Sequence, residues 1–454
     1  MPDVSVQSRR FRPEGFGAQG LRLNWFSPLP PARTAIGHYA LLVLPALARH
    51  AEVTVWTDRP YWPTELEGHA TVRQWDGRSW PELNSADVTL YHIGNNARFH
   101  GWILDVARQH PGVVVLHETR LHELFAAQLL DNAPDETAYL SAVRQCHGMA
   151  AVLHAQRFVR GEATAGELAD AIPLTELALE RARGVVVHTR TAFREVAALG
   201  RCSALQLELP YTAGPPPARR ERDGVLRLVV FGYLAANRRL HSLLEAIATF
   251  PGRQQLRLDI FGELDDGEPL ADRIRELDLG DIVQVRGFVP EADLDDVLGR
   301  SDLAVNLRFP TMGEASHSQL RIWSGGLASL VTRTGWYAEL PPETVGFVDP
   351  AKEVADLHDH FRAALAQPET LHAMGEAGRR HLETRHDPEI YVRDLLAGLD
   401  LMTKTPGSIL GEAGASVAGI VAASGIRGSA RAALVRRAAE ELCRWTAVPA
   451  SGKG

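Results

Sequence analysis

The residues whose types and spacing are most suited to binding or catalysis lie in one loop of the C-terminal half. The run Met312-Gly313-Glu314-Ala315-Ser316-His317-Ser318 follows a predicted strand and precedes a segment of helical character. Gly313 permits a tight turn, and the small and polar residues after Glu314 would lie at a helix N-terminus, where free amides attract anions and hydroxyls. Glu314 would face a ligand at this position. A capped helix with a solvated glutamate explains the spacing equally well.

The basic residues of this chain are almost all arginines. The sequence has 48 basic residues, of which only Lys352, Lys404 and Lys453 are lysines. An anion site inside the fold must therefore use arginine, backbone amides or helix ends.

Composition favours a soluble globular protein. Hydrophobic residues make up 45% and charged residues 23% of the chain, as in soluble domains. The net charge of −8 disfavours nucleic acid as the main partner. Three widely spaced cysteines, Cys146, Cys202 and Cys443, indicate a reducing compartment. With neither a signal peptide nor an apolar run of 18 residues in the sequence, a cytoplasmic location is expected.

Short apolar runs predict two sheets of parallel strands. In the first half the predicted strands cover residues 21–26, 51–57, 87–93, 112–117, 184–188 and 204–209. In the second half they cover 226–232, 256–261, 283–287, 303–308, 328–332 and 345–348. Helical patterns separate them, for example at 40–49 and 173–183. Strands that are apolar on both faces are typical of parallel sheets covered by helices on both sides.

A proline-rich segment divides the chain. Residues 212–224 contain Pro215-Pro216-Pro217 and a cluster of charges, which indicate a linker. The fold class predicted is α/β, with two doubly wound Rossmann-like domains facing a cleft and a C-terminal helical extension. The expected boundaries are an N-terminal domain at 1–211, the linker at 212–224, a C-terminal domain at 225–386, a closing helix at 387–402 and a basic, Ala/Gly-rich extension at 403–454.

The basic extension has three open interpretations. Residues 427–445 combine arginines with Leu434, Leu442 and Trp445, so they can form an amphipathic helix that lies on an anionic membrane. They can equally pack on a partner subunit or form a loosely ordered tail. The first interpretation predicts a peripheral location at the inner face of the membrane.

Several motifs, in their order along the chain, resemble the GT-B glycosyltransferases of family GT4. The resemblance covers roughly residues 20–400. In the second half it rests on Pro310-Thr311-Met312-Gly313-Glu314, Gly325-Gly326 and Gly335-Trp336-Tyr337-Ala338-Glu339. In the first half it rests on Phe26-Ser27-Pro28-Leu29-Pro30-Pro31, Thr34-Ala35-Ile36-Gly37-His38-Tyr39, Tyr91-His92-Ile93-Gly94-Asn95-Asn96 with Phe99-His100, and Val113-Val114-Val115-Leu116-His117-Glu118.

This resemblance implies a site and an activity. It implies a retaining transferase that moves a hexose or deoxyhexose from a nucleotide-diphosphate sugar to a glycan or lipid-linked acceptor, in surface polysaccharide or glycoconjugate biosynthesis. It implies catalytic roles for Glu314, which positions the sugar, and His117, which contacts it. The expected donor-binding residues are Arg238, Tyr233, Gly313, Ala315, Ser316, His317, Ser318, Glu339, Gly262 and Glu263. The expected cleft loop of the N-terminal domain is Thr34, Ala35, Ile36 and Gly37.

The donor motif departs from the family pattern at two places. The second glutamate that usually contacts the ribose would fall at Ile322, next to Arg321, and is absent. Tyr233 stands where the family has its phosphate-binding arginine, and Arg238 stands where it has lysine. We therefore expect the ribose and diphosphate contacts of this chain to differ from those of the family.

No metal or other cofactor is expected. Asp293 and Asp295 form a DxD, but the preceding Pro290-Glu291 and the following apolar period predict the first turn of a helix. His117 and His122 are five residues apart and would point about 140° away from each other on a helix. Convergence of these histidines with His92 and His100 on a metal is the less favoured alternative.

Other functions stay open. The absent glutamate and Tyr233 also suit a catalytically inactive GT-B subunit that serves as a binding or scaffold protein. A sugar-nucleotide epimerase or phosphorylase on the same fold is a further alternative. A Rossmann dehydrogenase is disfavoured, because no predicted strand is followed by GxGxxG.

Overall fold

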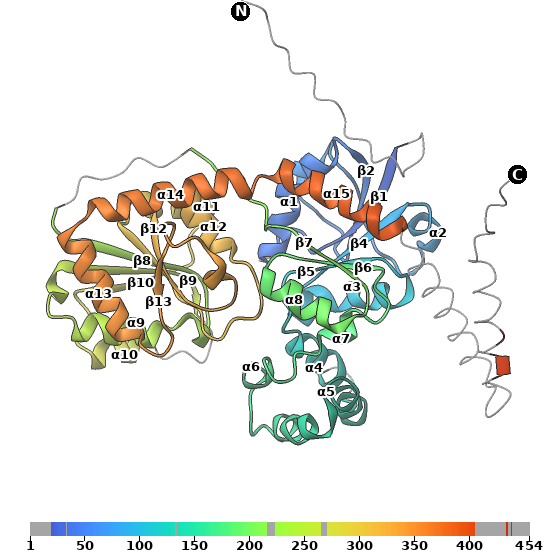
Figure 1. Cartoon of the computed structure of the whole chain (residues 1–454), viewed down its shortest axis with the longest axis horizontal. Coiled ribbons are helices and arrows are strands. Elements are labelled where there is room, and N and C mark those ends of the chain that lie inside the picture. Colours follow the sequence, from blue (N-terminus) through green and yellow to red (C-terminus); the bar gives the residue numbers. More distant parts are fainter. Residues whose placement is uncertain are drawn as a thin grey trace, which may run out of the picture. The chain divides into compact units, whose positions relative to one another are not determined.

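The computed structural model describes residues 20–32, 34–131, 134–215, 223–264 and 270–404, together with residues 433, 434 and 437. The chain divides into two compact units. The first takes its described residues from Met1–Val187, Phe193–Leu207 and Val392–Gly454, and the second from His188–Ala192 and Glu208–Tyr391. Each unit contains one sheet (Figure 1).

The first unit is built on a seven-stranded sheet in which all neighbouring strands are parallel. The strand order is β3-β2-β1-β4-β5-β6-β7. The strands are β1 (Leu21–Phe26), β2 (Ala51–Thr57), β3 (Thr71–Gln74), β4 (Val88–Ile93), β5 (Val113–Leu116), β6 (Gly184–Val187) and β7 (Ser203–Gln206). Every residue of β4, β5 and β6 is buried, as expected for central strands covered on both faces.

Helices connect these strands. They are α1 (Ala35–Leu47), α2 (Trp80–Leu83), α3 (Ala97–Gln109), α4 (His122–Leu130), α5 (Glu136–Val159), α6 (Ala165–Leu168), α7 (Thr175–Ala178) and α8 (Arg190–Leu199). Helices α4, α5 and α6 pack on one another and form a group beside the sheet (Figure 1). The closing helix α15 (Pro388–Lys404) contributes Met402, which lies against Gly184 of β6.

The second unit repeats the architecture with a six-stranded parallel sheet of order β10-β9-β8-β11-β12-β13. Its strands are β8 (Leu226–Leu234), β9 (Leu256–Leu264), β10 (Val283–Gly287), β11 (Leu303–Asn306), β12 (Ala328–Thr332) and β13 (Gly346–Val348). Its helices are α9 (Leu240–Thr249), α10 (Leu270–Glu276), α11 (Glu291–Arg300), α12 (His317–Ser324), α13 (Glu353–Ala366) and α14 (Glu369–Arg385). Helices α9, α10 and α13 cover one face and α11, α12 and α14 the other (Figure 1).

The predicted fold class, two doubly wound α/β domains, is confirmed, with boundary shifts of up to three residues in the strands. The acidic segment around Asp293 and Asp295 lies in the first half of α11, as predicted. The helix predicted at 173–183 is wrong, because only the single turn α7 forms there. Residues 427–445 lie outside the described residues apart from 433, 434 and 437. Within the described part of the chain, no helix is long and apolar enough to cross a membrane.

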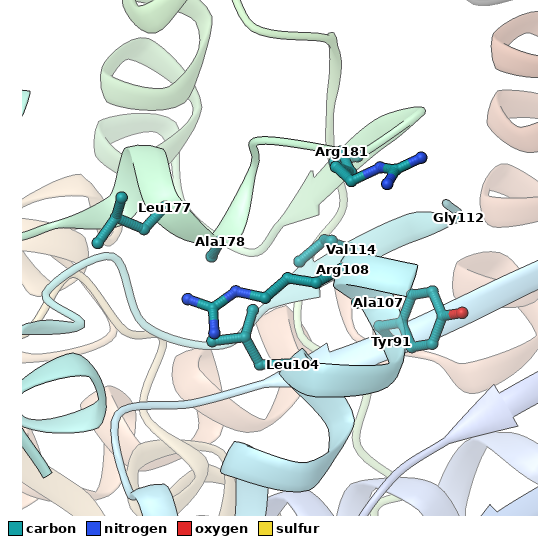
Figure 2. A pocket seen from close by; sticks show the side chains of 10 residues that line it. Tyr91, Leu104, Ala107, Arg108, Gly112, Val114, Leu177, Ala178 and Arg181 are labelled. Atoms are coloured by element: carbon teal, nitrogen blue, oxygen red, sulfur yellow. The ribbon is translucent and has the colours of Figure 1, made fainter. Parts of the chain in front are cut away.

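A pocket of the first unit is part of the packing rather than a ligand site. It lies beside β5 and is lined by Tyr91, Leu104, Arg108, Gly112, Val114 and Arg181 among others (Figure 2). Its volume of about 10 Å³ is enough for about one water molecule. A nucleotide or a sugar does not fit there.

Candidate functional site

The carboxyl ends of β8 and β9 form the floor of the predicted site, and glycine makes their close approach possible. Gly232 of β8 is in register with Gly262 of β9. Their φ angles are +113° and +129°, which L residues with a side chain rarely adopt. A Cβ on Gly262 would overlap the carbonyl oxygen of Gly232. The predicted residue Gly262 is therefore required by the backbone at this sheet edge.

Glu314 is the centre of a tightly bonded loop between β11 and α12. Its Oε2 accepts hydrogen bonds from the Thr311 hydroxyl at 3.0 Å and from the Met312 amide at 2.7 Å. Its Oε1 lies 3.3 Å from Nη1 of Arg308. Only 13% of the Glu314 side chain is exposed. The solvated glutamate considered as an alternative does not occur in this structure.

Arg238 interacts electrostatically with Glu314 and Arg308. It ends the short 3-10 helix Ala236–Arg238 that follows β8, and it is buried. Its Nη1 donates to Oδ1 of Asn306 at 2.9 Å and its Nη2 donates to the Phe231 carbonyl at 3.1 Å, whereas Nε has no hydrogen-bond partner. Burial and then the Arg308 cation lower the pKa of Arg238 to about 10, and Glu314 and Tyr337 oppose this. The guanidinium stays charged at neutral pH.

Arg308 is a functional candidate that the sequence analysis missed. It follows β11 and is partly buried, with 22% of its side chain exposed. It forms the ion pair with Glu314 and repels Arg238. Two guanidiniums and one carboxylate leave an excess positive charge at this sheet edge, which favours an anionic ligand. The sequence held one signal for Arg308. Because lysine is scarce, any arginine that follows a strand is a candidate for binding an anion.

The N-terminus of α12 lies at the same edge. Ser316 is the N-cap, and its hydroxyl accepts from the Gln319 amide at 3.2 Å. His317 packs edge-on against Tyr211 with ring centroids 5.1 Å apart. Gly232 is close to Ser318, because a Cβ there would lie 3.6 Å from the Ser318 hydroxyl. The last of these contacts places Ser318 beside β8, so the N-terminus of α12 and its free amides lie near Gly232.

The other predicted donor residues differ in their placement. Tyr233 is 61% exposed, and Glu263 is also exposed. The carboxylate of Glu339 accepts from the amides of Arg190 and Thr191 at 3.0 and 2.7 Å and from the Thr191 hydroxyl at 2.8 Å. Glu339 therefore caps the first turn of α8, which is a structural use of this carboxylate.

The place of the missing second glutamate is filled by core and ion-pair residues. Ile322 is 1% exposed and packs in the apolar cluster beneath α11 and α12. The guanidinium of Arg321 lies against Asp295, with Nε and Nη2 at 3.1 and 2.8 Å from Oδ1. Asp295 is thus an ion-pair partner of Arg321.

In the first unit, the predicted loop residues begin α1. Thr34 is the N-cap, and its hydroxyl accepts from the Ile36 amide at 3.1 Å. Gly37 lies against Pro30, because a Cβ there would be 3.3 Å from Pro30 Cδ. Ile36 reaches the carboxyl end of β4, where a Cβ on Gly94 would be 2.9 Å from its Cδ1. The structure therefore brings this loop and the end of β4 together.

His117 lies at the end of β5, where the sequence placed it. Its Nε2 is hydrogen-bonded to Nδ1 of His92 at 3.1 Å, and its ring packs edge-on against Tyr39. His92 stacks on Trp25 with centroids 4.0 Å apart. The next histidine, His100, bonds through Nδ1 to the His92 carbonyl at 3.1 Å. Burial lowers the pKa of His100 to about 4, so it is neutral at pH 7.

The fourth histidine of the metal alternative is used elsewhere. His122 bonds to the Ile172 carbonyl at 2.8 Å and to the Tyr139 hydroxyl at 3.1 Å. Among the residues that the structure describes, no group of three or more metal-ligating side chains is found.

Comparison with known families identifies the second unit. Residues 217–381 match the model of the family described as "Glycosyl transferases group 1". The second unit contains a glycosyl transferases group 1 domain. Its matched span includes β8 to β13 and every residue of the Arg238–Arg308–Glu314 cluster. The predicted enzyme class, a glycosyltransferase, is thereby confirmed. A comparison with curated protein sequences finds no match.

Solved structures extend the likeness to both units. The HepE protein of Anabaena in complex with UDP is 13% identical, with a TM-score of 0.55 over 84% of this chain and 100% of that one. The same protein in complex with UDP-glucose is 12% identical, with a TM-score of 0.57 over 83% and 100%. A sucrose-phosphate synthase from Thermosynechococcus elongatus is 15% identical, with a TM-score of 0.57 over 85% and 100%. The group 1 domain and the first unit thus share the GT-B fold of these proteins.

Proposed function

We propose that this glycosyltransferase moves a hexose or deoxyhexose from a nucleoside-diphosphate sugar to a glycan or lipid-linked acceptor, with retention of anomeric configuration. The observation that carries the proposal is the cluster of Arg238, Arg308 and Glu314 at the N-terminus of α12. Its excess cation suits a diphosphate, and its carboxylate suits the hydroxyls of a sugar.

The reaction places its largest charge change on the leaving group. The bond between the anomeric carbon and the diphosphate breaks, the acceptor hydroxyl oxygen bonds to the same carbon, and the hydroxyl proton passes to an oxygen of the departing diphosphate. Negative charge grows on the diphosphate as the sugar becomes oxocarbenium-like. Arg238, Arg308 and the free amides of α12 stabilise that charge in a partly water-excluded site. These groups supply positive charge without a metal ion.

Glu314 acts in this scheme as a positioning group for the donor sugar. In the described structure its two oxygens contact Thr311, Met312 and Arg308. A diphosphate that pairs with Arg308 competes for this guanidinium and releases Oε1 of Glu314 to a sugar hydroxyl. His117 is proposed as a second contact to the sugar, and its bond to His92 fixes the orientation of its ring.

UDP is the first nucleotide to test. HepE has been crystallised with UDP and with UDP-glucose, and it shares the fold of this chain. Base choice depends on side chains rather than on fold, so the assay must include other bases.

The test is a panel of UDP-, GDP-, ADP- and dTDP-sugars, scored by thermal shift and by release of free nucleoside diphosphate. A transferase stabilised by one donor and releasing its diphosphate at a measurable rate supports the proposal. Stabilisation without any release, with a range of glycan and lipid-linked acceptors, supports the alternative of a catalytically inactive binding subunit. Neither stabilisation nor release with any donor contradicts both.

A further inference from the structure

A chain of four buried polar side chains runs from the candidate phosphate-binding arginine to β12. Arg238 Nη1 donates to Asn306 Oδ1 at 2.9 Å, Asn306 Nδ2 donates to Gln319 Oε1 at 3.0 Å, and Gln319 Nε2 donates to the Ser329 hydroxyl at 2.7 Å. The four residues are 4%, 1%, 0% and 0% exposed, in this order. The chain links the 3-10 helix after β8, the strands β11 and β12, and the helix α12.

The direction of every bond follows from the arginine. A guanidinium only donates, so Asn306 must present its oxygen to Arg238 and its NH2 group to Gln319. Gln319 must then accept with its oxygen, and its NH2 group is left for Ser329. A flipped Asn306 would break both of its bonds, and a flipped Gln319 would place its NH2 group against that of Asn306, so the chain has one arrangement.

Gln319 also belongs to the N-terminus of α12. Its backbone amide donates to the hydroxyl of the N-cap Ser316. A glutamine at this helical position commonly bonds back to the N-cap residue in a capping box. Here its side chain reaches Asn306 and Ser329 instead. One residue therefore connects the helix N-terminus, which attracts anions, with the side chain that holds Arg238.

The three buried hydrogen bonds of this chain are expected to contribute little to the free energy of unfolding. Replacing a buried polar group by an apolar one of similar volume is often close to neutral for folding, provided no partner is left unpaired. What a satisfied buried network supplies is one fixed geometry. Near Arg238 that geometry is the separation between its guanidinium and the amides of α12.

We infer that Asn306 and Gln319 are positioning residues for the donor diphosphate. They hold Arg238 and the N-terminus of α12 at one spacing, so that a single diphosphate contacts both. This inference rests on the proposed function, because it assumes that Arg238 and α12 bind the donor. Neither residue touches the substrate in this account; both act through Arg238 and the helix.

The test compares Gln319→Leu with Gln319→Glu and measures the Kd of UDP by calorimetry, together with kcat and KM for the donor. Leucine breaks the chain at its centre. Glutamate keeps an acceptor for Asn306 and a partner for Ser329, since a hydroxyl both donates and accepts. We expect Gln319→Leu to raise the Kd and the donor KM at least about tenfold, with kcat changed less, and Gln319→Glu to restore most of the affinity.

Asn24→Leu is the matched control for losing a buried asparagine. Asn24 lies in β1 of the first unit, is 1% exposed, and bonds to Leu83, Thr89 and Trp56. This variant should lower the melting temperature without changing the Kd of UDP. Ser329→Ala, which removes only the end of the chain, should raise the Kd less than Gln319→Leu and keeps the test open where leucine prevents folding.

Two results separate the inference from the function beneath it. If Gln319→Leu and Ser329→Ala bind UDP as the wild type does while Arg238→Ala loses binding, the positioning role is overturned and the donor site stands. If Arg238→Ala also binds as the wild type does, the donor does not use this cluster and both proposals fail.

Discussion

Arg308 Nη1 lies 3.3 Å from Glu314 Oε1, and this ion pair joins the end of β11 to the loop before α12. The same Arg308 lowers the pKa of the buried Arg238. One carboxylate thus lies close to a pair of arginines, and the remaining positive charge is available to an anion. This relationship is the basis for the predictions on donor binding.

Arg308 should contribute directly to donor affinity. Arg308→Ala removes one of two cations, and we expect the Kd of UDP to rise about tenfold. Arg308→Lys keeps a point charge, so its Kd for UDP should lie between those of the wild type and Arg308→Ala. Calorimetry at two salt concentrations measures the effect, because loss of a phosphate contact also weakens the salt dependence of binding. An unchanged Kd in Arg308→Ala would limit Arg308 to holding Glu314.

Gly262 should not tolerate a side chain. Its φ of +129° and its contact with the Gly232 carbonyl leave no room for a Cβ. Gly262→Ala should lower the free energy of unfolding by more than about 2 kcal/mol. Gly280→Ala is the control in the same unit, because a Cβ there meets no atom within 4 Å. Urea unfolding compares them, and equal midpoints for both variants would contradict the described sheet edge.

The chain should lose stability below pH 6.5. Burial lowers the pKa of His100 in the first unit and of His386 in the second to about 4. Between pH 6.5 and 4 the unfolded chain therefore binds more protons, and unfolding is favoured as the pH falls. Each histidine accounts for about 3 kcal/mol over this interval.

Urea unfolding at several pH values between 7 and 4 measures this loss. His100→Asn removes the titrating group and should show a smaller loss on acidification. If the wild type and the variant lose the same free energy over this range, proton uptake by His100 does not cause the acid sensitivity.

Glu339 should act on stability rather than on donor binding. Its three hydrogen bonds to the first turn of α8 are those of a helix cap, worth about 1 kcal/mol. Glu339→Ala should lower the melting temperature and leave the Kd of UDP within about twofold of the wild type. Glu339→Gln retains an acceptor for the amides and should lose less stability. A tenfold weaker UDP affinity in Glu339→Ala would instead support a donor contact.

The sequence predicts strands well where they are buried on both faces. Runs such as Val113-Val114-Val115-Leu116 can only be central strands, and β5 lies there. It fails for β3 (Thr71–Gln74), an edge strand with three exposed residues and no apolar run. The helix predicted at 173–183 is also wrong. Only one helical turn, α7, forms between Pro173 and the start of β6 at Gly184.

The site follows the same division. Glu314 could be predicted from the strand, glycine-containing loop and helix around it and from the family's donor motif, and Arg238 could be predicted from that motif. Arg308, Asn306 and Gln319 were not found, because their roles depend on pairing between residues far apart in sequence. Asn306 and Arg238 are 68 positions apart, and no local pattern predicts that contact.

The central claim is that Glu314 belongs to the machinery of sugar transfer. The most direct measurement is the rate at which purified wild-type and Glu314→Ala proteins release nucleoside diphosphate from the donor that stabilises the wild type. We predict a loss of at least about a hundredfold in Glu314→Ala, with the circular dichroism spectrum unchanged. Full activity in a correctly folded Glu314→Ala protein would contradict the account.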